Sequence, residues 1–531
     1  MGAFNLIHEQ WLPILRASGR SARIAPWQVV DGIGSDPVVA FDWPRADFNG
    51  AALEFLIGLL ATACPPKDEE GWIELWEVPP APEMLRSAFD AIAHAFDVDG
   101  EGARFLQDID PLADAEPVDI GALLIDQPGG QTLRLNKDHF VKRGGVSVMA
   151  RATAAMALYT LQTYAPSGGQ GHRTSMRGGG PLITLIAPDR AGQPETLWHL
   201  LWANVEERRR PAAASDAPAV FPWLAPTLTS EKDKVVTTDN AHILQAHWGM
   251  PRRIRLVFEP AEGRICNLTG QPDPVVVTAF RMKNFGVNYI GWEHPLTPYA
   301  RAKLSEMPNP MKSNPGGVSY RHWLGLVQED AENGRNPAAC VTRFRRERAQ
   351  ICNDLAGIRL LAFGYDMDNM KARSWYQSEI PVPQVDPARR MDFEIVAARL
   401  VRGADMAAAL TRSYAKRALF SRPADTPGSF SLPGDRFWGA TEADFFALLH
   451  DLAGGAEETS VCDRWHDILR RTALGVFDEA VPTRGIENGA WQRVVTSRRA
   501  LSHMLNGDKL RGELGLAPLE RKAGRKKGAV A

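Results

Sequence analysis

A proline-rich segment at residues 380–387, IPVPQVDP, divides this chain of 531 residues into two parts of different character. Three prolines within eight residues are typical of a linker. Short β-branched runs alternate with helical stretches before this segment, and only helical spacing follows it. We therefore predict an α+β fold, with a large mixed α/β N-terminal domain at 1–379 and a C-terminal four-helix bundle at 386–515. A basic, disordered tail is expected at 516–531.

The pattern of apolar residues places the expected elements along the chain. Strands are predicted at 4–7 (FNLI), 23–30 (RIAPWQVV), 181–187 (PLITLIA) and 274–280 (PVVVTAF). Helices are predicted at 51–63 and 146–164, and the second of these runs into Pro166, where a loop begins. Beyond the proline-rich segment, helices are predicted at 389–420, 442–452, 461–480 and 490–505.

Composition excludes several classes of protein. The formal net charge of −2 gives no overall attraction to nucleic acid, so any such contact must come from local patches. The five cysteines are scattered without a CxxC spacing, which indicates a reducing cytoplasm and argues against a zinc module. The N-terminus lacks a basic leader, and the apolar run 51–64 is too short for a membrane span and contains Glu54. A cytoplasmic protein outside the membrane is expected.

The sequence contains none of the common catalytic motifs. A GxxxxGK[ST] phosphate loop, a GxSxG elbow and an HExxH metal motif are all missing. Two His-Asp pairs, His450-Asp451 and His466-Asp467, leave open a metal-dependent phosphohydrolase or nuclease in the helical part. Because both pairs fall in predicted helices without further metal ligands, we predict no catalytic centre, no metal and no cofactor.

The loop at residues 165–180, APSGGQGHRTSMRGGG, contains six glycines, Arg173 and Arg177, and no acid. Glycine lets the main chain approach another surface closely, and the arginines favour an anionic partner such as a nucleic-acid backbone. The loop lies in a stretch, 136–180, with six basic residues and one acid. An inert, flexible surface loop is the alternative interpretation, and it would leave the chain a helical scaffold that binds only proteins.

Three further segments are suited to contact with nucleic acid. Lys283 follows a predicted strand and precedes Gly286, so it can project as a point charge from a turn. Residues 363–376 carry Met367 and Met370, which can act as apolar wedges between bases, beside the amide of Asn369. Residues 126–145 form a long polar loop with a Pro-Gly-Gly turn.

These segments occur in an order that resembles the CasA family, the large subunit of the type I-E CRISPR surveillance complex Cascade. The resemblance covers nearly the whole length and is carried by 4–15 (FNLIHEQWLPIL), 126–129 (DQPG), the loop 165–180 with its ending Arg177-Gly178-Gly179, 292–298 (WEHPLTP), Gly364-Tyr365, and the helical C-terminal third.

The resemblance implies a non-catalytic, RNA-guided antiviral function. Members of the family recognise the protospacer-adjacent motif of foreign double-stranded DNA from the minor groove and promote strand opening for the guide RNA. They assemble with the crRNA-containing backbone and small subunits of Cascade and recruit a separate helicase–nuclease. The bundle contacts the displaced strand and neighbouring subunits.

The resemblance also implies site residues. The glycine loop along the motif corresponds to Ser167, Gly168, Gly169, Gln170 and Gly171. The lysine that enters the minor groove corresponds to Lys283, and the wedge to Asp368, Asn369 and Met370. The region near the RNA 5′ handle corresponds to Leu124, Ile125, Asp126, Gln127, Lys142 and Arg143. Two departures are visible: Asn369 stands where relatives carry glutamine, and Cys266 stands alone where some have clustered cysteines.

Overall fold

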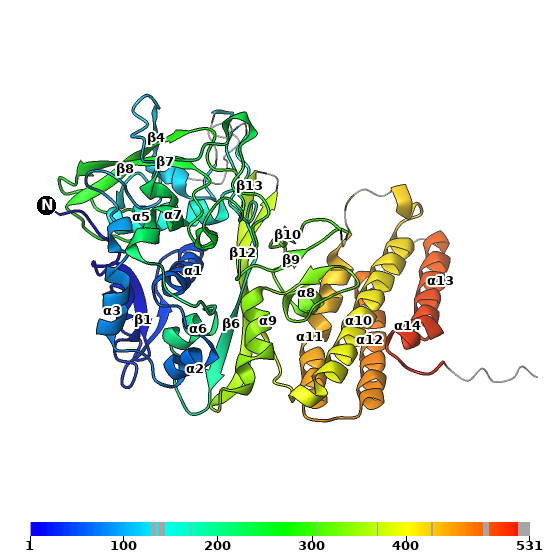
Figure 1. Ribbon diagram of the computed structural model, residues 1–531. Helices are drawn as coiled ribbons and strands as arrows, with labels where there is room; N and C mark the ends of the chain where they lie inside the picture. Colours follow the sequence, from blue (N-terminus) through cyan, green and yellow to red (C-terminus); the bar gives the residue numbers. More distant parts are fainter. Residues whose placement is uncertain are drawn as a thin grey trace, which may run out of the picture. The chain divides into compact units, whose positions relative to one another are not determined.

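The computed structural model describes residues 2–128, 134–135, 144–169, 171–303, 305–368, 370–425, 428, 430–481 and 488–518. The chain forms two compact units (Figure 1). The first unit comprises Met1–Val318 and Gly325–Glu379, and the second comprises Ser319–Leu324 and Ile380–Ala531. The second unit therefore begins at the start of the proline-rich segment, and it also takes in a short segment from much earlier in the chain, which the sequence did not indicate.

The first unit is built on antiparallel sheets. One sheet has the order β2-β1-β3, with β1 at Leu12–Arg16, β2 at Ser21–Ile24 and β3 at Val38–Phe41. A second has the order β4-β8-β5, and β7 also pairs with β8; its strands are β4 (Pro117–Asp119), β5 (Met149–Ala150), β7 (Arg253–Pro260) and β8 (Val275–Lys283).

A third sheet carries the longest strands of the described chain. Its order is β13-β12-β6, with β6 at Ile183–Arg190, β12 at Leu355–Asp368 and β13 at Lys371–Pro381. Strand β12 ends at Asp368 and β13 begins at Lys371, and the two strands pair as a hairpin with Met370 at its tip. A small sheet joins β9 (Tyr299–Ala300), β10 (Asn309–Pro310) and β11 (Arg335–Asn336).

Two buried helices form the centre of the first unit, α1 (Ala46–Ala63) and α5 (Arg151–Tyr164). Helix α1 is long and apolar enough to span a membrane by composition alone, but 89% of that window is buried inside the fold. Its Phe55 packs edge-on against Trp11 and Tyr159, with ring centroids 5.5 Å apart in both pairs. The shorter helices of this unit are α2 (Glu69–Glu77), α3 (Pro82–Asp90), α6 (Leu197–Ala203), α7 (Ala217–Val220) and α9 (Ala339–Arg346). Helix α8 (Trp323–Leu326) includes residues of both units.

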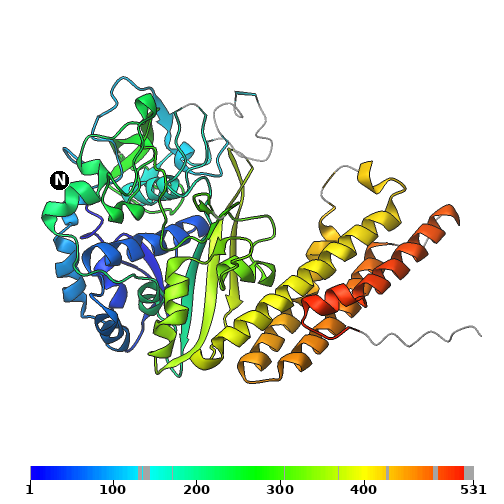
Figure 2. The ribbon, with the colours of Figure 1, turned by 45° about the vertical axis from the view of Figure 1, so that its right-hand side comes forward.

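The second unit contains long helices that run side by side (Figures 1 and 2). They are α10 (Arg390–Leu419), α11 (Leu432–Ala453), α12 (Glu458–Ala480) and α13 (Asn488–Leu505), followed by the short α14 (Asp508–Glu513). Helix α10 packs against α11, α12 and α13. Tyr320, from the segment Ser319–Leu324, stacks on Phe445 of α11 with ring centroids 4.3 Å apart. The predicted α+β class with a C-terminal helical bundle is confirmed.

Local predictions had mixed outcomes. Strands β6 and β8 confirm the predictions at 181–187 and 274–280. The strand at 4–7 is wrong, because only Asn5 forms an isolated bridge before the chain turns. The strand at 23–30 is half wrong, since Pro26 starts a 3-10 helix at Pro26–Val30.

Three predicted helix starts were also wrong. The helix predicted at 51–63 begins at Ala46. The helix predicted at 146–164 begins at Arg151, because Met149–Ala150 pair with β8 instead. Helix α11 begins at Leu432 rather than 442, with Pro433 in its first turn, where a missing amide hydrogen does no harm.

Candidate nucleic-acid interface

Several segments that the sequence singled out meet around one cavity of the first unit, with a volume of about 570 Å³. Ser167 and Gly168 of the glycine loop line it, as does Met370 at the tip of the β12–β13 hairpin. From the 124–127 segment, Leu124, Ile125 and Gln127 contribute. Arg252 and the β8 residues Phe280 and Met282 complete much of the wall. The structure thus brings together residues from five separate parts of the sequence.

Backbone hydrogen bonds hold the base of the glycine loop, and residues nearer its tip are exposed to solvent. The Ser175 amide donates to the Ala165 carbonyl at 3.1 Å, and the Gly180 amide donates to the Tyr164 carbonyl at 3.3 Å. Ser167, Gly168 and Gly169 between these anchors are exposed. A surface that approaches the tip therefore meets main chain with little side chain in front of it.

One backbone bond joins the glycine loop to the turn that follows Lys283. The Phe285 amide donates to the Gly171 carbonyl at 2.8 Å. Gly171 has a φ of +78°, and a Cβ at this position would lie 2.7 Å from the Cβ of Asn284. Only glycine allows this close approach, so the two segments keep a fixed separation.

Lys283 is the last residue of β8, and it forms an ion pair with Asp114, with Nζ 2.5 Å from Oδ1. Its side chain is 29% exposed. Because neighbouring side chains of a strand point to opposite faces, Met282 lines the cavity and Lys283 does not. The ion pair with Lys283 is the largest cause that lowers the pKa of Asp114.

Two arginines that the sequence assigned to a basic patch are buried and form ion pairs inside the fold. Arg177 is buried and forms an ion pair with Glu54 at 2.7 Å. Arg151 is buried between Asp99 and Asp273, at 3.0 and 2.8 Å. Arg173 donates to the Ser230 hydroxyl at 2.8 Å. The interpretation of Arg177 as an anion-binding residue is therefore wrong, since its charge is already neutralised.

The hairpin tip presents a methionine to solvent. Met370 is 55% exposed, and Asp368 is exposed as well. Met367 has a different role, because a Cβ on Gly180 would lie 2.6 Å from its Cγ. One methionine thus packs on the end of the glycine loop, and the other is left free at the tip.

Helix α1 ties these segments together through two acids that the sequence analysis did not assign to the site. Asp47 accepts from the Tyr365 hydroxyl of β12 at 2.6 Å and pairs with Arg45 at 2.9 Å. Arg45 also pairs with Asp126, at 3.0 Å. Glu54, two turns further along α1, accepts from the Tyr164 hydroxyl and pairs with Arg177. The sequence did contain a sign of this role, namely a carboxylate inside an otherwise apolar helix. A buried carboxylate needs a buried partner, so its presence predicts a contact with another segment.

Some predicted site residues lie outside the residues that the structure describes: Gln170, Asn369, Lys142 and Arg143.

The His-Asp pairs of the helical unit have other partners. His466 is buried, and its Nε2 lies 2.9 Å from the Leu505 carbonyl oxygen. Asp451 pairs with Arg464 at 2.8 Å, and Asp467 pairs with Arg470 at 3.3 Å. Within the described ranges, no group of three histidine, cysteine or acidic side chains could hold a metal ion. This arrangement gives no support to a metal-dependent hydrolase.

Comparison with known proteins decides the family. The family model of CRISPR-associated protein Cse1 matches residues 5–476. The chain belongs to the Cse1 family. The resemblance to CasA is thereby confirmed, since a solved Thermus thermophilus structure carries both names, CasA (Cse1). No curated protein matches the chain.

Solved structures share the Cse1 fold along almost the whole chain. The Thermus thermophilus CasA (Cse1) structure is 17% identical, with a TM-score of 0.68, and the match covers 95% of this chain and 100% of that one. Thermobifida fusca Cse1 is 17% identical, with a TM-score of 0.69 and coverage of 97% and 99%. A chain in a structure described as a CRISPR RNA-guided surveillance complex is 16% identical, with a TM-score of 0.71 and coverage of 95% and 100%.

Proposed function

We propose that this Cse1 family member is the large subunit of a type I-E RNA-guided surveillance complex and recognises a short motif in foreign duplex DNA without cutting it. The bond between the Phe285 amide and the Gly171 carbonyl carries the proposal, because it places an exposed glycine loop beside the turn of Lys283. The similarity to a chain of a surveillance complex supports the assembly with RNA-containing subunits. The protein acts in the cytoplasm.

The chemistry of the loop and the lysine fits the minor groove. This groove presents a degenerate pattern of acceptors, so backbone amides and one ammonium group read it in a relaxed way. The exposed main chain of Ser167, Gly168 and Gly169 can lie along the groove wall, and Lys283 exchanges Asp114 for a DNA acceptor. A reader of this kind accepts several related motifs.

Met370 and Asp368 at the hairpin tip act next to the motif. An exposed apolar side chain that enters a base step lowers the cost of unstacking. One step of DNA stacking is worth about 1.4 kcal/mol on average, and the guide heteroduplex restores it later. The wedge therefore has to lower only the barrier to the first open pairs. Leu124, Ile125, Asp126 and Gln127 lie near the RNA handle. The helical unit contacts the displaced strand and neighbouring subunits, and the subunit as a whole recruits the helicase–nuclease.

The test is binding of duplex DNA by the reassembled complex. Lys283→Ala should weaken binding of motif-bearing duplex by about tenfold and reduce the preference over duplex without the motif. Lys303→Ala is the matched control, since Lys303 is also an ion-paired surface lysine of the first unit, 3.4 Å from Glu306. Unchanged affinity and motif preference in the Lys283 variant would refute the proposal.

The nuclease alternative has its own test. The purified protein is incubated with manganese or magnesium and labelled single- or double-stranded DNA. We expect no cleavage. Cleavage that His466→Ala abolishes would favour the enzyme.

A further inference from the structure

The inner wall of the 570 Å³ cavity beside the glycine loop takes no part in the proposed DNA contact. That contact involves the exposed tips of the loop and of the β12–β13 hairpin, whereas the inner wall belongs to a sheet and to helix α5. The volume falls in the range of pockets that hold small molecules. The chemistry of this wall indicates which class of small molecule fits.

Apolar side chains from the sheet and the helix form most of the wall. Phe280 and Met282 lie on the same face of β8, because side chains two residues apart on a strand share a face. Val118 of β4 pairs directly with Phe280, and Leu161 of α5 also lines the cavity. The buried Leu124 adds to this surface. A ligand that fills the cavity therefore needs an apolar body.

One buried cation, Arg252, lines this apolar cavity without a counter-charge. The residue is 7% exposed, and within the described part of the chain no carboxylate lies in ion-pair distance of its guanidinium group. Its Nη2 donates to the Pro166 carbonyl, and its Nε has no hydrogen-bond partner among the described residues. Burial lowers the pKa of Arg252 to about 10, so the group stays charged at neutral pH. A buried cation without a counter-charge is costly, and an anionic ligand removes that cost.

The rest of the lining also favours a negative charge at this point. A Cβ on Gly168 would lie 2.8 Å from Nη1 of Arg252, so the absent side chain leaves room for the guanidinium group. Burial and the charge of Arg252 lower the pKa of His172, whose ring is therefore neutral at neutral pH. The other charged residue of the lining is the exposed Lys371, and no aspartate or glutamate of the described chain lines the cavity.

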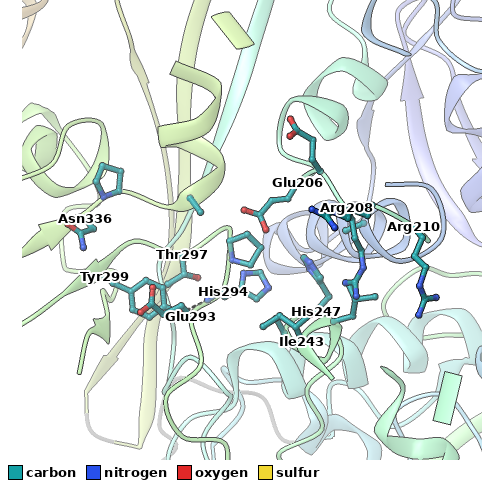
Figure 3. A pocket seen from close by; sticks show the side chains of 18 residues that line it. Glu206, Arg208, Arg210, Ile243, His247, Glu293, His294, Thr297, Tyr299 and Asn336 are labelled. Carbon is teal, nitrogen blue, oxygen red and sulfur yellow. Dashed lines mark hydrogen bonds between the residues drawn. The ribbon is translucent and has the colours of Figure 1, made fainter. Parts of the chain in front are cut away.

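A larger cavity of the first unit, of about 620 Å³, has a different charge pattern (Figure 3). Acids and arginines line it together: Glu206, Glu207, Glu293, Arg208, Arg209 and Arg210. Glu206 pairs with Arg343 at 3.8 Å, and Arg210 pairs with Asp216 at 2.7 Å. Because both signs of charge are present and partly paired, that lining gives no preference for an anion. The preference belongs to the cavity of Arg252.

We propose that the cavity of Arg252 binds a small amphiphile with one anionic headgroup, a medium-chain carboxylate, with the headgroup at Arg252 and the alkyl chain along Phe280 and Met282. A guanidinium group and a carboxylate form charge-assisted hydrogen bonds, which are the strong ones in a site that excludes water. The apolar wall supplies the remaining affinity. The binding does not rest on the proposed function, because Lys283 and the main chain at the loop tip take no part in it.

Calorimetric titration of the full-length protein with octanoate, below its micelle concentration, tests the proposal. Octanoate should bind with one site per chain and raise the midpoint of thermal unfolding. Hexanoate should bind about tenfold more weakly, because two buried methylene groups are lost. 1-Octanol, which has the chain without the charge, should also bind about tenfold more weakly or worse. AMP, an anion with a polar body, should bind more weakly than octanoate.

Two variants separate the headgroup from the chain. Arg252→Met should weaken octanoate binding by about tenfold or more and leave 1-octanol binding unchanged, since only the charge is lost. Arg281→Met is the matched control, because Arg281 also donates to main-chain carbonyls, those of Ala113 and Ala115, but does not line the cavity. Met282→Gln should weaken octanoate and 1-octanol alike, by about threefold or more, because the wall becomes polar.

Several outcomes would overturn the proposal. They are absence of octanoate binding at millimolar concentration, equal affinities for octanoate and 1-octanol, tighter binding of AMP, or octanoate binding that survives Arg252→Met. If Arg252→Met does not fold, the comparison of octanoate with hexanoate and 1-octanol on the parent, together with Met282→Gln, decides the question.

Discussion

The Phe285 amide and the Gly171 carbonyl form a 2.8 Å hydrogen bond between two segments that are far apart in the sequence. Phe285 adopts a φ of +61°, which is rare for a bulky residue, and Gly171 adopts +78°. Both ends of the bond thus depend on unusual backbone geometry. The relative position of the glycine loop and the Lys283 turn is therefore set by the fold itself.

Gly171→Ala tests whether DNA binding depends on the position of the glycine loop and not only on its content of glycine. The left-handed backbone alone costs about 1–2 kcal/mol for a residue with a Cβ, and the contact with Asn284 adds to this. Gly192→Ala is the control, because Gly192 has a φ of +67° and open space around its Cβ position. Denaturant unfolding should show the larger loss for Gly171→Ala, and only this variant should weaken binding of motif-bearing duplex by the complex. Equal DNA affinity of both variants would contradict the role of the junction.

Asp114→Asn should have the opposite effect on DNA binding. The substitution releases Lys283 from its ion pair and removes a negative charge near the DNA. The complex should bind duplex about two- to fivefold more tightly at low salt, and less so at high salt. Glu306→Gln, which releases Lys303 in the same way, should not change affinity. A weaker complex in the Asp114 variant would mean that Asp114 holds Lys283 in its working position.

Met370→Ala should slow strand opening and leave the stability of the protein unchanged. The side chain is 55% exposed, so its loss creates no cavity. Without the wedge, opening of the first base pairs should slow by about tenfold, the equivalent of one stacking step. Fluorescence of 2-aminopurine beside the motif reports this opening. Met391→Ala, at a methionine that is 72% exposed on α10, is the control, and equal opening rates for both variants would count against the wedge.

The sequence indicated more of the fold than of the site. The proline-rich segment and the helical spacing after it predicted the change of architecture, since periodicity is a local property. Burial of Arg177 was not predictable from its surroundings in the sequence, where every neighbour suggested an exposed basic loop. Its partner Glu54 lies in a distant helix, and pairing between the two depends on tertiary structure. The place of Tyr320 in the helical unit was not predictable for the same reason, because it depends on tertiary contacts with Phe445 and Thr441.

The buried pair of Glu54 and Arg177 should show strong coupling in a double-mutant cycle. Arg177→Met leaves the Glu54 carboxylate with the Tyr164 hydroxyl and no counter-charge, and should cost about 3–5 kcal/mol of unfolding free energy. Adding Glu54→Gln should restore part of this loss, because the orphaned charge is removed. Urea unfolding of the parent, both single variants and the double variant measures the coupling. Additive losses would show that the two groups do not act as a pair.

Stability should fall as pH drops below neutrality, and His199 is one cause. Burial and the nearby Arg190 lower the pKa of His199 to about 4. Between about pH 6.5 and pH 4 the unfolded chain binds a proton there and the folded chain does not, so the unfolding free energy falls by about 1.4 kcal/mol per pH unit. His199→Asn should reduce this slope in urea titrations across that pH range. An unchanged slope would rule out His199 as a source.

Helix α1 holds the glycine loop and the hairpin by the buried carboxylates Asp47 and Glu54, and Arg45, just before the helix, pairs with Asp126 of the 124–127 segment. Residues that position these elements are therefore separate from residues that would meet a nucleic acid. Such a division allows tip residues to diversify among relatives while the framework persists, which fits a shared architecture at 16–18% identity to solved structures such as those from Thermus thermophilus. Exchange of the tips between family members, with α1 kept constant, would then transfer motif preference from one protein to another.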